Sequence, residues 1–551
     1  MLKEGGFVSE EVVSRLEDVA RKEGRSIGEV ILEQGVLTNE QMGQLMSMQT
    51  GLSYAHLKQS HVPEEVLAHI PLAFAVSHQM IAFKEDEEGV HVATSQPYDQ
   101  HAIDLLRKKM DQNVVLHYAT PNDVKLALHL YKSDLSDQIK KLAGQIALSS
   151  ESEESEAVEM AQLVDLLIEY AYNAKSSDLH IEPQESDVII RFRVDGVLND
   201  ILSFDKKLHD QLVTRIKILA RLRTDEHFAA QDGHIKHEYD GESVDLRISI
   251  LPTVHGEKVV MRLLAEKSRQ FTLEELGMNA DDLAKLQEHA KKPWGMILVT
   301  GPTGSGKTTT LYAVLKLLNR REVNISTIED PVEYSLGGIN QIQVNPRAKL
   351  TFSTGLRSIV RQDPDIIMVG EIRDIETGDI AVNAALTGHL LLSTLHTNDA
   401  ATSLPRLIEM EVEPFLVAST VNVVLAQRLI RRVCPRCISS GEYTIEQLEE
   451  DGLLIPEKAK ARLFQEGKAT LFHGGGCSLC NHSGYYGRMG IFEILEIDSE
   501  IRKMILAEQS SDVIKDYAVA EHGMTTMFDD ALEKVAQGQT TLEEILRVVR
   551  D

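Results

Sequence analysis

Apolar segments alternate along residues 293–432 between short continuous runs and stretches with helical spacing. The runs Met296–Val299 and Ile366–Val369 are continuous, as is typical of strands buried on both faces of a parallel sheet. Between them, four apolar residues recur at i, i+3, i+4 and i+7, the spacing of one helix face: Leu311, Val314, Leu315 and Leu318. This alternation predicts a mostly parallel α/β sheet.

A region with a different order of elements precedes this sheet. The spacing of apolar residues predicts a helix over Val158–Ala174 and another over Leu208–Leu222. Three apolar runs around the second helix predict strands, at residues 188–196, 244–252 and 257–264. This order of elements predicts an α+β domain that ends near Leu264.

The rest of the pattern suggests further divisions of the chain. The segment SSESEESE (149–156) is acidic, serine-rich and poor in apolar residues, which predicts a flexible linker. In chain order we expect an N-terminal helical region (1–60), a small α+β domain (61–132), the acidic linker (133–156), the α+β domain (157–265), the α/β core (266–432), a cysteine-containing subdomain (433–490) and a C-terminal helical region (491–551).

Charge and hydropathy narrow the functional classes. The formal net charge is −28, and non-specific binding of nucleic acid needs a basic surface, so no nucleic-acid partner is expected. The N-terminus lacks the apolar segment of a secretory signal. No stretch reaches the roughly 18 apolar residues of a membrane-spanning helix. We therefore expect a cytoplasmic protein that reaches a membrane only through a partner.

The segment GPTGSGKT (301–308) matches the phosphate-binding pattern G-x-x-x-x-G-K-[ST]. It follows one predicted strand and begins a predicted helix, which is the context the motif requires. Backbone N–H groups of such a loop surround phosphate oxygens, and the helix N-terminus adds positive potential. We expect Lys307 to reach the β- and γ-phosphates of ATP and Thr308 to hold Mg²⁺. The predicted ATP-binding residues are Gly301, Pro302, Thr303, Gly304, Ser305, Gly306, Lys307, Thr308 and Thr309.

Three carboxylates are candidates for activating the water that attacks ATP. Glu371 directly follows the run Ile366–Val369, at the sheet edge where α/β proteins bind ligands. Its carboxylate could orient that water or accept its proton. Glu329 and Glu333 belong to a second acidic cluster, IEDPVEY (328–334), and could share this work. Which of the three is the general base stays open.

Two histidines flank the predicted strand LLLSTL (390–395). His389 precedes it and His396 follows it. An imidazole near the γ-phosphate could sense hydrolysis, and a structural role for each ring is the alternative.

The four cysteines form two C-x-x-C pairs, Cys434/Cys437 and Cys477/Cys480. In a cytosolic protein this spacing favours a zinc site over disulfides. Two such pairs supply four thiolates in a tetrahedron, so the zinc would be structural.

Several segments together resemble one family. GPTGSGKTTTLYA, STIEDPVEY, RQDPDIIMVGEIRD and LTGHLLLSTLHTNDA have the order and approximate spacing found in the type II/type IV secretion ATPases. SDLHIEP, RFRVDGVL, QDGHI and LPTVHGEKVVMRLL are similar to the domain that precedes the motor in that family. The resemblance is strong over 157–551 and moderate over 1–132. The four-cysteine insertion is similar to that of the assembly branch.

The resemblance implies a multidomain α/β fold, with a RecA-like P-loop ATPase core preceded by α+β domains, a zinc-binding subdomain and C-terminal helices. It implies a homohexameric motor that uses ATP, Mg²⁺ and Zn²⁺ to power assembly of a type IV pilus or a type II secretion pseudopilus. An inner-membrane platform protein would be its partner, at the inner face of the cell membrane. Arginines of the preceding domain would close over ATP: Arg191, Arg193, Arg247 and Arg262. The family's usual Q-D-G-R is here QDGH, so His234 stands where the family's pattern has an arginine.

Residues 25–49 are similar to a motif that binds cyclic di-GMP in some pilus-assembly ATPases. The order Arg25-Ser26-Ile27-Gly28 displaces its arginine by one residue, so we favour a docking or packing role. Two rival functions are a nucleic-acid translocase of related fold, which the acidic balance disfavours, and a non-catalytic scaffold, which the intact Lys307, Thr308 and Glu371 disfavour.

Overall fold

The computed structural model describes residues 39–57, 62–110, 113–128, 133–148, 153–239, 242–265, 271–450 and 452–549. The chain divides into two compact units. One is Met1–Asn173 with the short segment Cys477–His482, and the other is Ala174–Gly476 with Ser483–Asp551. Most of the run 25–49, which resembles the cyclic di-GMP motif, lies outside the described residues.

The first unit is built around a four-stranded sheet of order β1-β4-β3-β2. β2 and β3 are antiparallel, while β4 pairs in parallel with β3 and β1. Its elements are α3 (Asn39–Thr50), β1 (Ser53–Tyr54), α4 (Glu64–Leu67), α5 (Leu72–His78), β2 (Met80–Asp86), β3 (Gly89–Thr94), α6 (Gln100–Lys109), β4 (Val114–Tyr118), α7 (Pro121–Ala127), α8 (Ser133–Leu148) and α9 (Glu153–Asn173).

The prediction of a flexible linker over 133–156 is wrong for most of its length. Residues 133–148 form α8, and α9 already begins at Glu153. Ile139, Ala143 and Ile146 are buried at helical spacing, and α8 packs against α9. An apolar stripe therefore orders this segment, although the acidic sequence beside it is typical of linkers.

The second unit begins with a six-stranded antiparallel sheet of order β7-β6-β5-β10-β9-β8. Alternate residues give it one buried and one polar face, because successive side chains of a strand point to opposite sides. On β10, for example, Val259 and Met261 are buried while Arg262 is exposed. The elements are β5 (Ser176–Pro183), β6 (Asp187–Val194), β7 (Val197–Asp205), α10 (His209–Leu219), β8 (Gln231–Tyr239), β9 (Glu242–Thr253) and β10 (Gly256–Ala265).

The predicted parallel sheet follows, with seven strands in the order β13-β12-β14-β15-β11-β16-β19. All neighbouring strands pair in parallel except β16 and β19. Its elements are α11 (Ala280–Ala290), β11 (Gly295–Thr300), α12 (Lys307–Leu318), β12 (Ile325–Glu329), β13 (Asn340–Gln343), α13 (Phe352–Ile359), β14 (Ile366–Val369), α14 (Ile375–Leu386), β15 (Leu390–Leu395), α15 (Ser403–Glu409), α16 (Pro414–Thr420), β16 (Val421–Val433) and β19 (Tyr485–Glu496).

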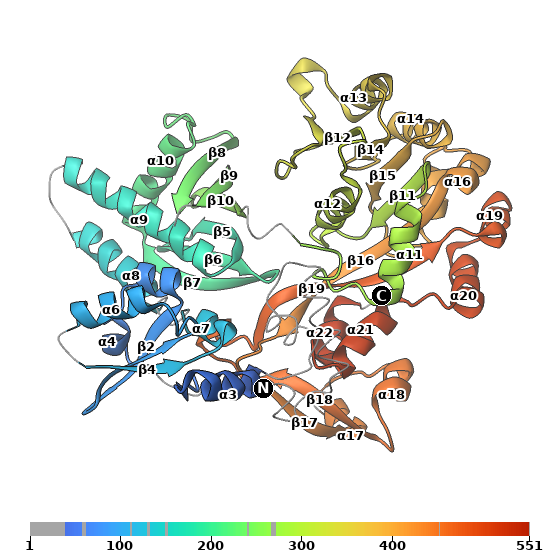
Figure 1. Ribbon diagram of the computed structural model, residues 1–551. Coiled ribbons are helices and arrows are strands. Elements are labelled where there is room, and N and C mark those ends of the chain that lie inside the picture. The colour runs from blue at the N-terminus through green and yellow to red at the C-terminus, as the bar shows by residue number, and fades with distance from the viewer. Residues whose placement is uncertain are drawn as a thin grey trace. The chain divides into compact units, whose positions relative to one another are not determined.

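Helices cover both faces of this sheet (Figure 1). On β11, Ile297 and Val299 pack into a core shared with α11 and α12. Met296 and Leu298 face the other way, into a core that extends over α13–α16 and the C-terminal helices. The predicted fold class, a P-loop core preceded by α+β domains, is confirmed.

An insertion separates β16 from β19. It contains a two-stranded antiparallel sheet, β17 with β18, and two short helices. Its elements are β17 (Ile438–Thr444), α17 (Ile445–Glu450), α18 (Glu457–Leu463) and β18 (Lys468–Gly474). The chain then ends in helices α19 (Ser499–Leu506), α20 (Ser511–His522), α21 (Met527–Ala536) and α22 (Leu542–Val548), as the sequence predicted. Among the described residues, no helix combines the length and hydropathy needed to cross a bilayer.

Candidate functional site

The phosphate-binding motif forms a tight loop between β11 and α12, as predicted. Three of its glycines have positive φ: Gly301 (145°), Gly304 (80°) and Gly306 (89°). A Cβ at Gly301 would lie 2.4 Å from the carbonyl oxygen of Gln427, so this position also needs glycine for space. The loop ends at the N-terminus of a 12-residue helix, where backbone N–H groups and the helix dipole favour an anion.

Lys307 lies at the start of α12 and is largely buried. Its Nζ donates hydrogen bonds to the carbonyl oxygens of Gly301 (2.7 Å) and Pro302 (3.1 Å). Burial lowers the pKa of Lys307, and the negative charge of Glu371 opposes this effect. The ammonium therefore sits on the loop itself, at the same edge of the sheet as Glu371. Thr308, the predicted Mg²⁺ ligand, is half-buried in the same first turn.

Gln427 on β16 supports this loop, a role that no motif of the sequence indicates. Its side chain is 2% exposed. Its Nε2 donates to the carbonyl oxygen of Ser305 (2.7 Å), and its Oε1 accepts from Oγ1 of Thr310 (2.7 Å). One buried amide thus fixes both the loop and the first turn of α12. The partners are more than 115 residues apart in sequence, so only the sheet order could reveal this contact.

Glu371 follows β14 at the same sheet edge as the phosphate-binding loop. Its Oε2 is 2.6 Å from Nε of Arg373 and 3.2 Å from Nε2 of His396. The Glu371 side chain is 12% exposed, whereas those of Arg373 and His396 are largely open to solvent. The structure therefore brings Glu371 and His396 together, with Arg373 as a partner not singled out from the sequence.

The two histidines lie at opposite ends of β15, so the structure favours for His389 the structural role that the sequence left open. Residues Gly295–Thr300 of β11 pair in register with Leu390–Leu395 of β15. His396 therefore follows β15 beside the phosphate-binding loop, while His389 lies at the opposite edge, about 20 Å away for a six-residue strand. There His389 Nδ1 is 2.8 Å from the carbonyl oxygen of Ala384, near the end of α14. Its role in this structure is local.

Glu329 is buried at the end of β12. It accepts hydrogen bonds from Oη of Tyr312, Oγ1 of Thr327 (2.6 Å) and Nε2 of Gln341 (3.2 Å). Burial raises the pKa of Glu329, and these hydrogen bonds oppose that shift. Three donors already engage this carboxylate, which favours a structural role over one as a base.

Glu333 lies on the loop after β12 and contacts the preceding α+β domain. Its Oε2 is 3.4 Å from Nη1 of Arg247, and Nη2 of the same arginine donates to the carbonyl oxygen of Val332 (3.0 Å). Arg247 thus binds the segment that also carries Glu333.

The predicted arginines lie on the polar face of the six-stranded sheet. Strand register places Arg193, Asp178, Arg262, Arg247 and His234 side by side on successive strands β6, β5, β10, β9 and β8. Asp178 is buried between two arginines, with Oδ1 3.0 Å from Nε of Arg262 and Oδ2 3.6 Å from Nε of Arg193. Neighbours in such a row share one face of the sheet. His234, the position that departs from the family pattern, stands at the end of this row.

Arg191 is two residues from Arg193 but pairs with different carboxylates. Its guanidinium contacts Asp200 (2.7 Å) and Glu182 (3.3 Å), and Lys258 also binds Glu182 (2.7 Å). Arg191 is therefore paired within its own sheet, whereas Arg262 keeps 64% of its side chain exposed.

The four cysteines lie together as predicted. Their sulfur atoms are all within 4.8 Å of one another, and those of Cys477 and Cys480 are 3.7 Å apart. Tetrahedral zinc with Zn–S bonds of about 2.3 Å would place its sulfurs about 3.8 Å apart. The backbone N–H of Cys477 also points to the sulfur of Cys480 (3.2 Å). The donor set and its spacing therefore fit a structural zinc ion.

Comparison with known proteins identifies two segments. The family model described as Type II/IV secretion system protein matches residues 152–547, and the MshEN domain matches residues 50–139. The type IV pilus assembly ATPase PilB of Myxococcus xanthus is 37% identical over 99% of this chain and 97% of its own. The type II secretion system ATPase E of Vibrio cholerae is 45% identical over 76% of this chain and 80% of its own.

A solved structure shares the fold. The ATPase DotB of Legionella pneumophila aligns with a TM-score of 0.51 and 21% identity, over 70% of this chain and 94% of its own. The P-loop geometry, the Glu371–His396 pair and a family match over most of the sequence agree with one another. The chain belongs to the type II/IV secretion system protein family and is an ATP-hydrolysing enzyme.

Proposed function

We propose that this chain is a homohexameric motor that hydrolyses ATP to power assembly of a type IV pilus or a type II secretion pseudopilus. The observation that carries the proposal is that the parallel strands β11 and β14 place Lys307 and Glu371 at one edge of the sheet, in a family whose relatives include ATPases of both machines. Such a motor would act at the cytoplasmic face of the inner membrane, with a membrane platform protein as its partner.

In this proposal the loop 301–306 and the N-terminus of α12 bind the ATP phosphates through backbone N–H groups. Lys307 releases the loop carbonyls and places its charge on the β- and γ-phosphates. Thr308 would hold Mg²⁺ through its hydroxyl, and the ion would supply positive charge that offsets the charge of the phosphates. Glu371 orients the attacking water and takes its proton, and His396 and Arg373 fix the direction of its carboxylate.

The arginine row of the preceding sheet gives a reason for assembly into a ring. Arg262 and Arg193 share the single carboxylate of Asp178. The row contains no second carboxylate, so this face of the sheet keeps a positive charge. Arginine suits phosphate because its planar fork donates two parallel hydrogen bonds. We infer that Arg193, Arg247 and Arg262 close over ATP, and that Arg191 organises the neighbouring strands.

The rival function of a nucleic-acid translocase has less support. It would need a basic binding surface on a chain whose net charge is −28. DNA-stimulated ATP hydrolysis would favour it over the motor that we propose.

The experiment is light scattering combined with an ATPase assay on the full chain. We expect a particle of six subunits in the presence of Mg²⁺ and a non-hydrolysable ATP analogue. The rate of ATP hydrolysis per subunit should rise with subunit concentration. A species that stays monomeric at high concentration with the analogue bound would contradict the ring. Identification of the membrane protein that co-purifies with the chain would then assign the machine.

A further inference from the structure

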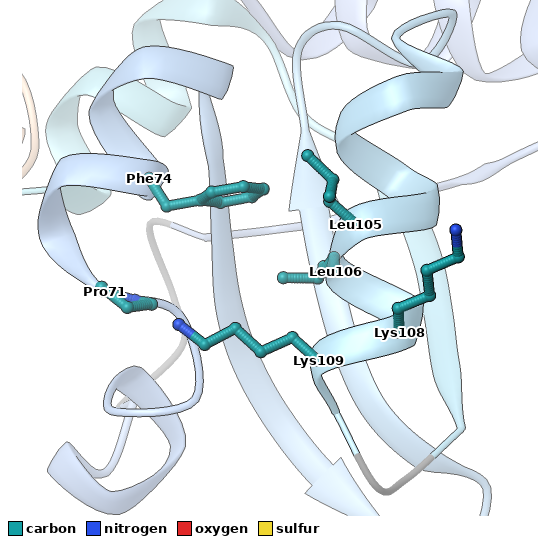
Figure 2. Close-up of a pocket in the computed structure, with 6 residues that line it drawn as sticks. All are labelled: Pro71, Phe74, Leu105, Leu106, Lys108 and Lys109. Atoms are coloured by element: carbon teal, nitrogen blue, oxygen red, sulfur yellow. The ribbon is translucent and has the colours of Figure 1, made fainter.

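The first unit contains an apolar pocket that has no part in the ATP site. It lies between α5 and α6 and has a volume of about 340 Å³. Its lining residues are Pro71, Phe74, Leu105, Leu106, Lys108 and Lys109. Figure 2 shows the ring of Phe74 extending from α5 toward Leu105 and Leu106 on α6.

The floor of the pocket is apolar although the pocket opens to the surface. Leu106 is 2% exposed and belongs to the core of this unit, whereas Leu105 beside it is 43% exposed. Leaving leucine in contact with water is unfavourable in proportion to its apolar area. An apolar hollow with a charged rim is typical of a binding surface.

The rim of the pocket is basic. α6 ends in Arg107-Lys108-Lys109, the one place in the sequence where three cationic residues are adjacent. Lys108 and Lys109 are exposed, and in the described part of the chain neither ammonium is paired with a carboxylate. Cations suit the C-terminal dipole of a helix, but the dipole does not account for the apolar hollow beside them. Both features together favour a ligand that is apolar on one side and negatively charged on the other.

We propose that this pocket docks an acidic amphipathic helix of a partner protein. A cavity of about 150 Å³ accepts a benzene-sized group, so this one has room for about two large apolar side chains. Side chains spaced at i and i+4 on the partner would enter between α5 and α6. Aspartate or glutamate residues beside them would pair with Lys108 and Lys109, whose flexible stems let the ammonium groups follow the partner.

An anionic lipid surface fits this pocket less well than an acidic helix does. Glu85 to Glu88 are four consecutive acidic residues at the β2–β3 turn. Glu85 Oε2 is 3.0 Å from Nε2 of His69, two residues before Pro71 of the pocket. A flat membrane that touched both lysines would also approach these carboxylates and be repelled. A helix of about 10 Å diameter can contact the lysines alone.

The test uses the full chain and a fluorescein-labelled synthetic helix with leucines at i and i+4 and glutamates on both sides of them. We expect saturable binding in fluorescence anisotropy that weakens as salt increases. The double variant K108E/K109E should weaken it about tenfold or more, because each reversal replaces an attraction with a repulsion. Leu105→Asp should do the same, and its exposed position leaves the fold intact.

The matched control is K140E/K141E, a pair of exposed adjacent lysines on α8 of the same unit. This variant should bind the peptide as the wild type does, and a peptide with serines in place of the leucines should not bind. Equal affinity of the wild type and K108E/K109E, or no binding at millimolar peptide, would overturn the proposal. Binding to phosphatidylglycerol vesicles that these same substitutions abolish, without peptide binding, would replace the helix by a membrane.

Discussion

Replacing Gln427 with leucine tests whether a buried amide on β16 holds the ATP-binding loop in its binding conformation. Leucine has a similar volume but cannot form the two 2.7 Å hydrogen bonds to Ser305 and Thr310. The substitution leaves one carbonyl and one hydroxyl without these partners. At about 1–3 kcal/mol for each unsatisfied group, the free energy of unfolding should fall by about 2–6 kcal/mol. The lower end is expected, because the loop borders solvent and can relax.

The same substitution should weaken nucleotide binding. Fixing the backbone of one residue costs about 1–2 kcal/mol, which corresponds to a factor of about 5–30 in affinity. If Ser305 must be ordered anew when ATP binds, the dissociation constant should rise by that factor. Titration with a fluorescent ATP analogue measures the affinity, and denaturant unfolding measures the stability.

Thr310→Val is the matched control for this prediction. It removes the hydroxyl that Gln427 accepts from but keeps the hydrogen bond from Gln427 to Ser305. Stability should fall while the affinity for the analogue stays within about twofold of the wild type. A folded Gln427→Leu variant with wild-type affinity would refute the reasoning, as would equal losses of affinity in both variants.

Three further substitutions probe the site. Lys307→Ala should lower ATP turnover by about 10²-fold or more, because it removes a positive charge from the phosphate-binding loop. The circular dichroism spectrum should stay unchanged, and wild-type turnover would contradict the role of Lys307. The Glu371→Gln variant should still bind ATP but hydrolyse it about 10²–10⁴-fold more slowly in single-turnover assays, because the carboxylate acts on the attacking water. Loss of nucleotide binding instead would assign the activation of water to Glu333. The Cys477→Ser variant should contain about one zinc per chain less than the wild type by elemental analysis, and its insertion should be less stable. ATP turnover should change less. Wild-type protein purified without chelator that contains no zinc would refute the site.

The sequence predicted the parts of the site that depend on local order. The loop 301–308 and Glu371 each follow a continuous apolar run, and the end of a parallel strand fixes where such residues emerge. The sequence leaves the roles of His389 and His396 open, because the strand between them separates the two histidines by its whole length. The motifs suggested that both belong together, but only the strand direction shows that they lie at opposite edges.

Contacts that depend on strand order or register could not be predicted. Asp178 pairs with Arg262, 84 residues away, and Gln427 binds Ser305, 122 residues away, so each contact joins segments far apart in sequence. The predicted linker failed for another reason. The acidic composition of 149–156 is typical of a linker, but Ile139, Ala143 and Ile146 have the spacing of a buried helix face.

The position of the cysteine-containing insertion has a mechanical consequence. Both of its ends continue into strands of the central sheet, because β16 enters it and β19 leaves it. A pull on the insertion along the strand axis would therefore draw β16 and β19 in the same direction. This loads β16 in shear against β11, its parallel neighbour, so that all the hydrogen bonds between Met296–Thr300 and Val421–Ala426 resist at once. The phosphate-binding loop begins where β11 ends, so ATP bound there would lie at the end of a stiff element through which tension would be transmitted.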